Sequence, residues 1–345
     1  MKRPSGTIRI LIAEDSPVQL AVLRFVLEED GGFTVLGTAG DGSEAVAMAA
    51  KLRPDIILMD YHMPRMNGVE ATREIMRRTP VPIVIASAGL QPNDVALSIE
   101  ALRCGALAVT VKPTDLADSN HTRHATELVQ TLNLMSEVKV VRRWAPASEQ
   151  PGKPLAVPKR RKTVKIIAIG GSTGAPAVIG NILAALPANF PIPIVLVQHM
   201  AVGFMEGFAL WLNQKSAVTV RIAKSGEEIL PATAYVAPDD VHLTVGPDGR
   251  LQLQSAPPEQ GFRPSVNYLF RSIAKSYGTT GMAILLTGMG CDGVDGLVNL
   301  RRTGGITIAQ DEASCVAFGM PREAIQQNCV DYVLSPQGIV ELMRL

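Results

Sequence analysis

The chain has 345 residues, of which 47% are hydrophobic and 19% charged, and its formal net charge is +1. This length predicts about two domains of ~150 residues each, and the composition excludes a disordered chain. Because a net charge near zero provides no global field for nucleic acid or membranes, we expect no nucleic-acid partner and recognition through local sites.

The four cysteines are dispersed, without a Cys-x-x-Cys pair, at Cys104, Cys291, Cys315 and Cys329. This spacing disfavours a zinc site or a disulfide framework and favours a reducing cytoplasm. The amino-terminal residues lack the apolar core of a signal peptide, and no apolar run approaches ~18 residues. We therefore expect a soluble, cytoplasmic monomer without membrane insertion.

In the first third of the chain, apolar runs of strand length each end in polar residues. They cover residues 8–13, 56–59, 83–86 and 108–111. Helix-length segments separate them, which is typical of βαβ units in a doubly wound parallel sheet. The polar residues that follow such strands converge on one edge of the sheet, where open α/β sheets place their sites.

A linker is predicted between two domains. Residues 128–138 keep a near-helical apolar spacing that leaves the first domain, and residues 145–163 contain four prolines and a basic run at 159–162. We interpret the basic run as solvated linker, with contact to a receptor or DNA as the alternative. The predicted boundaries are a first domain at 1–125, a helical and then Pro-rich basic linker at 126–163, and a second domain at 164–345.

The second domain resumes the α/β rhythm with a strand at 164–169, a glycine-rich turn, a helix to about Leu186 and a strand at 194–197. Residues 247–249, Pro-Asp-Gly, predict an antiparallel hairpin between 241–245 and 250–254. The expected fold is thus α/β, with two doubly wound domains, the second mostly parallel with an antiparallel hairpin.

The first candidate site is an acidic pocket formed by Glu14, Asp15, Asp60, Ser87 and Lys112, which terminate four strands. Three neighbouring carboxylates need a cation, and hard oxygen ligands suit Mg²⁺. Asp60 is the candidate nucleophile, since attack on phosphorus would give an aspartyl-phosphate. Lys112 would pair with the phosphoryl oxygens and Ser87 would donate a hydrogen bond to them. The alternative for any one acid is a solvated loop residue.

The stretches ILIAEDSP, DIILMDYHMPRMNG, IVIASA and VTVKP resemble the receiver domains of response regulators over about residues 7–125. The resemblance implies a flavodoxin-like fold with Asp60 as phosphoacceptor. It also implies Mg²⁺ held by Asp15, Asp60 and the backbone carbonyl of His62, with Glu14 assisting, and a cis Lys112–Pro113 peptide bond. His62 replaces an acid common in this family, and its side chain is expected at the surface.

The second candidate site begins at Ser172, on a glycine-flanked turn between a strand and a helix. The match to Gly-x-Ser-x-Gly (Gly170, Ser172, Gly174) suggests a nucleophile elbow. A nucleotide-binding loop is the rival interpretation. That rival requires a third glycine at Gly-x-Gly-x-x-Gly spacing and an acid about 20 residues further on, and neither is present.

A base and an orienting acid are available at later strand ends. His199 follows the strand at 194–197, and Asp292 lies in a glycine-rich bend after another apolar strand, so Ser172, His199 and Asp292 form a candidate triad. His242 competes for the role of base, although His199 is favoured. Cys291 is the rival nucleophile, but we favour a small packed cysteine because nothing nearby would lower its pKa.

The stretches IGGSTGAP, VQHM, SGEEILPATAYVAPDDVHL, FRPSVNYLF and LLTGMGCDGVDGL resemble the catalytic domain of the chemotaxis protein-glutamate methylesterases, the CheB family, over most of residues 164–345. The resemblance implies Ser172 as nucleophile, His199 as general base and Asp292 as its orienter. It further implies that Thr173 and the backbone at Met289 hold substrate or oxyanion. No cofactor is expected for the esterase.

Four positions depart from the family's common residues. Gly171 replaces alanine, Ala175 replaces glycine, Cys291 replaces asparagine and Asn267 replaces an acid. None of them removes a member of the triad. The departures therefore bear on rate and substrate fit more than on the type of reaction.

The expected function is a phosphorylation-regulated hydrolase that removes glutamyl methyl esters from chemoreceptors in chemotaxis adaptation and also deamidates receptor glutamines. The expected partners are methyl-accepting chemoreceptors as substrate and a histidine autokinase as phosphodonor. A catalytically idle scaffold that binds receptor or kinase is the alternative. A DNA-binding response regulator is disfavoured because the second domain has no basic recognition helix.

Overall fold

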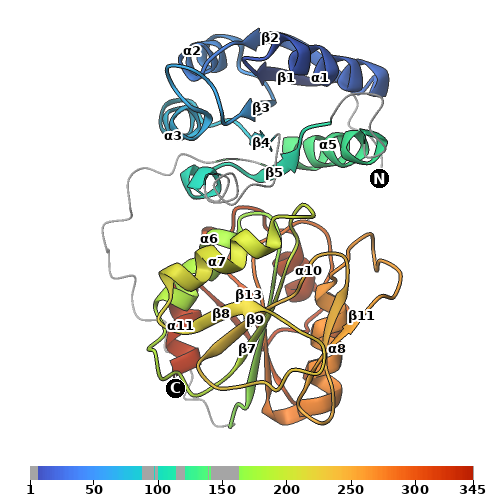
Figure 1. Cartoon of the computed structure of the whole chain (residues 1–345). Coiled ribbons are helices and arrows are strands. Elements are labelled where there is room, and N and C mark those ends of the chain that lie inside the picture. Colours follow the sequence, from blue (N-terminus) through green and yellow to red (C-terminus); the bar gives the residue numbers. More distant parts are fainter. Residues whose placement is uncertain are drawn as a thin grey trace. The chain divides into compact units, whose positions relative to one another are not determined.

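The computed structural model describes residues 7–87, 97, 100–113, 121–138, 140 and 163–344. The chain divides into two compact units, residues 1–150 and 151–345 (Figure 1). The basic run at 159–162 and most of the predicted linker lie outside the described residues. In the described part of the chain, no helix is both long and apolar enough to cross a bilayer.

The first unit contains a five-stranded parallel sheet in the order β2-β1-β3-β4-β5. Its strands are β1 (Ile8–Ala13), β2 (Phe33–Ala39), β3 (Ile56–Asp60), β4 (Ile83–Ser87) and β5 (Ala108–Val111). Its described helices are α1 (Pro17–Asp30), α2 (Gly42–Leu52), α3 (Gly68–Arg78) and α5 (His121–Ser136). Every residue of β3 and β4 is buried, which explains their continuous apolar sequence.

Side-chain caps start the helices of this unit close to the strand ends. Ser16 accepts a hydrogen bond from the Gln19 amide at the start of α1, and Asp41 accepts from Ser43 and Glu44 at the start of α2. Because the chain turns from strand to helix within a few residues, the polar residues that follow β1 and β2 stay at the edge of the sheet.

The second unit contains a seven-stranded sheet in the order β14-β13-β12-β6-β7-β9-β8, in which all neighbours are parallel. Its strands are β6 (Ile166–Gly171), β7 (Ile194–Gln198), β8 (Thr219–Ile222), β9 (Thr233–Val236), β12 (Gly281–Leu285), β13 (Ile306–Gln310) and β14 (Tyr332–Leu334). The predicted hairpin forms a separate antiparallel pair, β10 (His242–Val245) and β11 (Leu251–Gln254). The predicted fold class is confirmed.

The helices of this unit are α6 (Ala175–Ala184), α7 (Met205–Lys215), α8 (Val266–Tyr277), α9 (Val294–Arg302), α10 (Met320–Gln326) and α11 (Pro336–Arg344), with short 3₁₀ turns at Gly278–Thr280 and Glu312–Ser314. Helix α8 packs closely on the sheet. A side chain at Gly170 would clash with Val266, so glycine at the end of β6 lets the first turn of α8 approach the strand.

The order of the strands creates a switch point at β6. From β6 the chain proceeds to β7, β8 and β9 on one side, and then returns to place β12, β13 and β14 on the other. Ligands of open α/β sheets bind in the crevice outside the carboxyl ends of the strands at such a point. The segments that follow β6, β7 and β12 therefore meet at one location.

Candidate active site and phosphoacceptor pocket

The structure brings together four side chains of the predicted acidic pocket, Glu14, Asp15, Asp60 and Lys112. Carboxylate oxygens of Glu14, Asp15 and Asp60 lie within 4.8 Å of one another. The Lys112 ammonium lies 2.7 Å from Glu14 Oε2 and 2.8 Å from Asp60 Oδ2. Burial raises the pKa of Glu14, an effect that the hydrogen bond and charge of Lys112 oppose. Three carboxylates and one lysine leave an excess of negative charge, so the donor set fits a hard divalent cation such as Mg²⁺.

The remaining residues of the pocket are placed as follows. Ser87 ends β4 and is fully buried, and its carbonyl accepts a hydrogen bond from the Lys112 amide at 2.8 Å. The His62 side chain is exposed, as expected, and its amide donates to Asp60 Oδ1 at 3.2 Å. The prediction of a cis bond before Pro113 is wrong for this structure, in which the cis peptide bond of the described residues joins Arg263 and Pro264.

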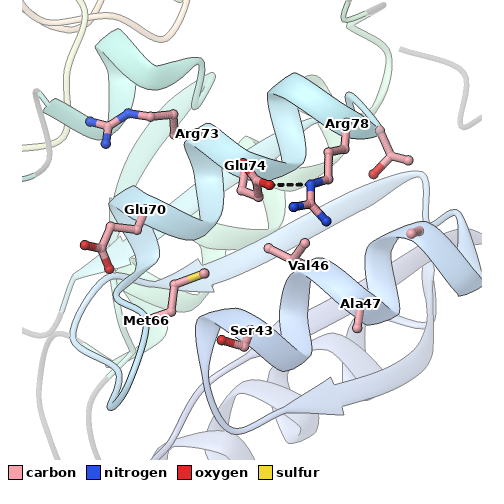
Figure 2. Close-up of a pocket in the computed structure, with 10 residues that line it drawn as sticks. Ser43, Val46, Ala47, Met66, Glu70, Arg73, Glu74 and Arg78 are labelled. Atoms are coloured by element: carbon pink, nitrogen blue, oxygen red, sulfur yellow. Dashed lines mark ion pairs between the residues drawn. The ribbon is translucent and has the colours of Figure 1, made fainter.

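A groove of about 540 Å³ between α2 and α3 is separate from this pocket (Figure 2). Its lining includes Val46, Ala47 and Met66. Glu74, another lining residue, is paired with Arg78 and with Arg77. None of the predicted site residues lines the groove, so we assign no chemistry to it.

Ser172 follows the last residue of β6 and is held through its backbone. Its amide donates to the Thr287 carbonyl at 3.1 Å, and its carbonyl accepts from Gln198 Nε2 at 2.9 Å. Gly174 has φ +79°, a conformation that favours glycine, and ends the turn from which α6 begins. These contacts confirm the predicted strand-to-helix turn around Ser172.

His199 follows β7 directly beside this turn. Gly171 and Gln198 are register partners, and the His199 amide donates to the Gly171 carbonyl at 3.0 Å. His199 Nε2 lies 2.9 Å from Asp292 Oδ2, whereas His199 Nδ1 is buried and has no hydrogen-bond partner among the described residues. Because a carboxylate only accepts, Nε2 is the nitrogen that carries a proton in this contact, and in the neutral imidazole Nδ1 is the basic atom.

Ser172 and His199 do not hydrogen-bond to each other in the described structure: no such bond joins the hydroxyl to the imidazole. Ser172 directly follows Gly171 and His199 directly follows Gln198, and Gly171 and Gln198 are register partners. The two residues therefore lie at the ends of adjacent strands. Catalytic hydrogen bonds are often loose without substrate and tighten when it binds.

Asp292 has no exposed surface and accepts four hydrogen bonds. Oδ1 accepts from the Ser265 hydroxyl at 2.7 Å and the Asn267 amide at 3.0 Å, and Oδ2 accepts from the Val266 amide at 2.7 Å and from His199. Burial raises the pKa of Asp292, but the hydrogen bond and charge of His199 and the donors at Ser265 and Val266 outweigh burial and lower it. The carboxylate is thus held ionised at the amino terminus of α8.

Thr287 and Gln198 are supporting residues that we did not predict. The buried Thr287 hydroxyl donates to the Thr173 carbonyl at 2.9 Å and accepts from the Ala317 amide at 2.9 Å. Thr287 therefore ties the Ser172 turn to the loop after β13. The available signal was its position, the first polar residue after the apolar run that ends β12. Thr173 is buried and Met289 half-buried, and their substrate or oxyanion roles remain predictions.

The surroundings of His242, the rival base, and of Cys291, the rival nucleophile, do not suit these roles. His242 is fully buried, with Nε2 3.0 Å from the Pro257 carbonyl and Nδ1 accepting from the Ser265 amide at 3.2 Å, so neither nitrogen is free to act as a base. Burial and nearby acids raise the pKa of Cys291, which opposes a thiolate nucleophile. The expectation that Cys291 is packed is wrong, because the residue is exposed.

Two departures from the family pattern compensate each other. A Cβ at Gly171 would clash with the Cβ of Ala175. The family commonly has alanine at position 171 and glycine at position 175, whereas this chain has the reverse. In both cases one methyl group occupies the same small space behind the Ser172 turn. This pairing explains how both departures coexist with an intact turn.

Comparison with known proteins agrees with this arrangement of sites. Residues 10–122 match the family model described as response regulator receiver domain, and residues 167–343 match the one described as CheB methylesterase. Fold and sites together define a response regulator whose output unit is a hydrolase with a mostly parallel α/β sheet. The chain belongs to the CheB methylesterase family.

Similar proteins span nearly the whole chain. A Geobacter metallireducens protein-glutamate methylesterase/protein-glutamine glutaminase is 45% identical over 337 residues, which is 96% of this chain and 97% of the relative. A Nitrosospira multiformis protein of the same name is 46% identical over 338 residues, 96% of this chain and 95% of the relative. The Thermotoga maritima CheB methylesterase catalytic domain is 40% identical with a TM-score of 0.51, covering 52% of this chain and 97% of that domain.

The compensation between positions 171 and 175 predicts a coupled pair. Gly171→Ala alone should lower the free energy of unfolding by about 1–3 kcal/mol through overpacking, and Gly171→Ala with Ala175→Gly should recover most of that loss. Denaturant unfolding of the single and double variants measures the coupling. Equal destabilisation of both variants would contradict it.

The lowered pKa of Asp292 predicts a pH-dependent contribution to stability. A carboxyl group whose pKa is lower in the folded state than in the unfolded state stabilises the folded protein fully above about pH 5. That contribution is lost as the pH falls, first through the pKa of the unfolded state and then through the pKa of the folded state. Asp292→Asn should therefore lower the free energy of unfolding by about 3 kcal/mol near neutral pH, and the difference should shrink in acid. Unfolding across pH measures it, and a difference that grows in acid would refute the assignment.

Proposed function

We propose that this chain is a phosphorylation-regulated protein-glutamate methylesterase that also deamidates protein glutamines. The observation that carries the proposal is the geometry of His199. Its Nε2 is held by a buried, ionised Asp292, while its Nδ1 is left basic at the strand end that adjoins Ser172. This arrangement suits acyl transfer by a serine nucleophile.

The first half of the reaction forms an acyl-enzyme. Ser172 Oγ attacks the carbonyl carbon of a γ-glutamyl methyl ester, and His199 Nδ1 takes the hydroxyl proton. Asp292 stabilises the resulting imidazolium through Nε2. Collapse of the tetrahedral intermediate expels methoxide, which leaves as methanol with the proton from Nδ1. Thr173 and the backbone at Met289 are proposed to hold the substrate or the developing oxyanion.

The second half releases the product. Water loses a proton to His199 Nδ1 and attacks the acyl carbon, and Ser172 leaves with the proton restored. The products are a glutamate side chain and the free enzyme. A glutamine side chain would follow the same path with ammonia as the first leaving group, which accounts for deamidation by the same three residues.

We propose that the first unit controls this activity through phosphorylation of Asp60. The phosphodonor would be a histidine autokinase and the substrate a chemoreceptor. Asp15, Asp60 and the His62 carbonyl would hold Mg²⁺ with Glu14 assisting, and the ion would neutralise phosphoryl charge when bound. Lys112, which contacts Glu14 and Asp60, would pair with the phosphoryl oxygens, and Ser87 would donate to them.

Loss of the nucleophile should abolish the esterase. Ser172→Ala is expected to lower kcat by about 10³- to 10⁶-fold if the triad acts as a unit. The assay is release of labelled methanol from methyl-esterified chemoreceptor membranes, with folding checked by circular dichroism. Methanol release at the wild-type rate by the folded variant would indicate another nucleophile, and absence of release by the wild type would leave the idle-scaffold alternative.

Loss of the phosphoacceptor should remove regulation. With a small-molecule phosphodonor such as acetyl phosphate and Mg²⁺, the wild type should release methanol faster, whereas Asp60→Asn should show equal rates with and without the phosphodonor. Asp55→Asn is the matched control, since it neutralises an exposed carboxylate of the same unit. Stimulation that persists in Asp60→Asn would contradict the assignment.

A further inference from the structure

The ring of Phe262 lies flat on the imidazole of His199. The ring centroids are 3.9 Å apart and the planes differ by 3°. Phe262 is half-buried and lies on the loop between β11 and α8.

His199 needs a second restraint to present Nδ1 reliably. Its imidazole makes one hydrogen bond among the described residues, from Nε2 to Asp292, and Nδ1 makes none. A single hydrogen bond fixes the position of Nε2. The ring can still tilt about the axis that joins Nε2 to the Cβ atom. A parallel aromatic ring fixes the plane, and with the plane it fixes the direction of the Nδ1 lone pair.

Phe262 lies at the end of a hydrogen-bonded turn formed by residues 259–262. Glu259 and Phe262 exchange two backbone hydrogen bonds, at 3.1 and 2.9 Å, around Gln260 and Gly261, which both have positive φ. The Glu259 carboxylate pairs with the Arg271 guanidinium, with Nη1 at 2.8 Å. The turn that carries Phe262 is thereby anchored to α8, the helix whose amino terminus holds Asp292.

Asn267 connects the same turn to the Asp292 loop. Its side-chain amide donates to Glu259 Oε1 at 3.2 Å, while its side-chain carbonyl accepts from the Gly293 and Gly296 amides at 2.9 and 3.0 Å. Its backbone amide donates to Asp292. An ionised acid, common at this position in the family, could not donate to Glu259. The Asn267 side-chain amide can therefore donate to the Glu259 carboxylate where an acid could not.

We propose that Phe262 is a positioning residue for the general base. It orients His199 Nδ1 toward Ser172, and the anchored turn of residues 259–262 holds it there through Arg271 and Asn267. The inference rests on the proposed function, because it assigns to Phe262 a role that acts through His199.

The test compares Phe262→Leu, Phe262→Tyr and a matched control, Tyr268→Leu. Tyr268 is also half-buried and stacks on a histidine, His242, with centroids 3.7 Å apart. Phe262→Leu should lower kcat for methanol release from the methyl-esterified receptor by about 10- to 100-fold through misorientation of the base, with KM nearly unchanged. Phe262→Tyr should restore kcat, and Tyr268→Leu should keep it near wild type.

A second readout does not depend on activity. In ¹⁵N spectra of the full chain, assigned with His199→Gln, wild-type His199 should be the Nε2-protonated tautomer, and Phe262→Leu should show a mixture of tautomers. A wild type that releases no methanol but shows this difference would defeat the proposed function and keep the positioning role. Unchanged His199 spectra, or equal losses of kcat in Phe262→Leu and Tyr268→Leu, would overturn the positioning role.

Discussion

Asp292 carries a negative charge with no exposed surface, and the second unit is built around the four donors that make this possible. An unpaired buried carboxylate would cost several kcal/mol, so Ser265, Val266, Asn267 and His199 must all reach it. Three of these donors come from the start of α8, which approaches β6 closely because Gly170 has no side chain. The buried charge thus fixes both the helix and the imidazole, and the imidazole in turn defines the basic nitrogen.

The two units follow one architectural rule with different chemistry. In each, polar residues that follow buried parallel strands converge at the carboxyl edge of the sheet. In the first unit this edge gathers carboxylates and a lysine, which suits a cation and a phosphoryl group. In the second it gathers a hydroxyl, an imidazole and a single buried carboxylate, which suits acyl transfer. The fold supplies the meeting point, and the residue types decide the reaction.

The rule is also why much of both sites could be predicted from the sequence. Residues such as Asp60, Ser172 and His199 lie within three residues of the ends of apolar runs, so their convergence needs no knowledge of strand order. The contacts of Phe262 and Asn267 could not be predicted, because they depend on how loops pack after the sheet has formed and leave no periodic signal. Cys291 was misjudged for the same reason, since its exposure is set by the loop around it.

The central claim is that His199 activates Ser172. Mass spectrometry of the full chain treated with a serine-directed fluorophosphonate tests it most directly, since the label bonds only to an activated hydroxyl. The account predicts modification at Ser172 in the wild type and much slower modification in folded His199→Gln. Labelling of Ser172 at the same rate in both proteins, or no labelling of Ser172 in the wild type, would contradict it.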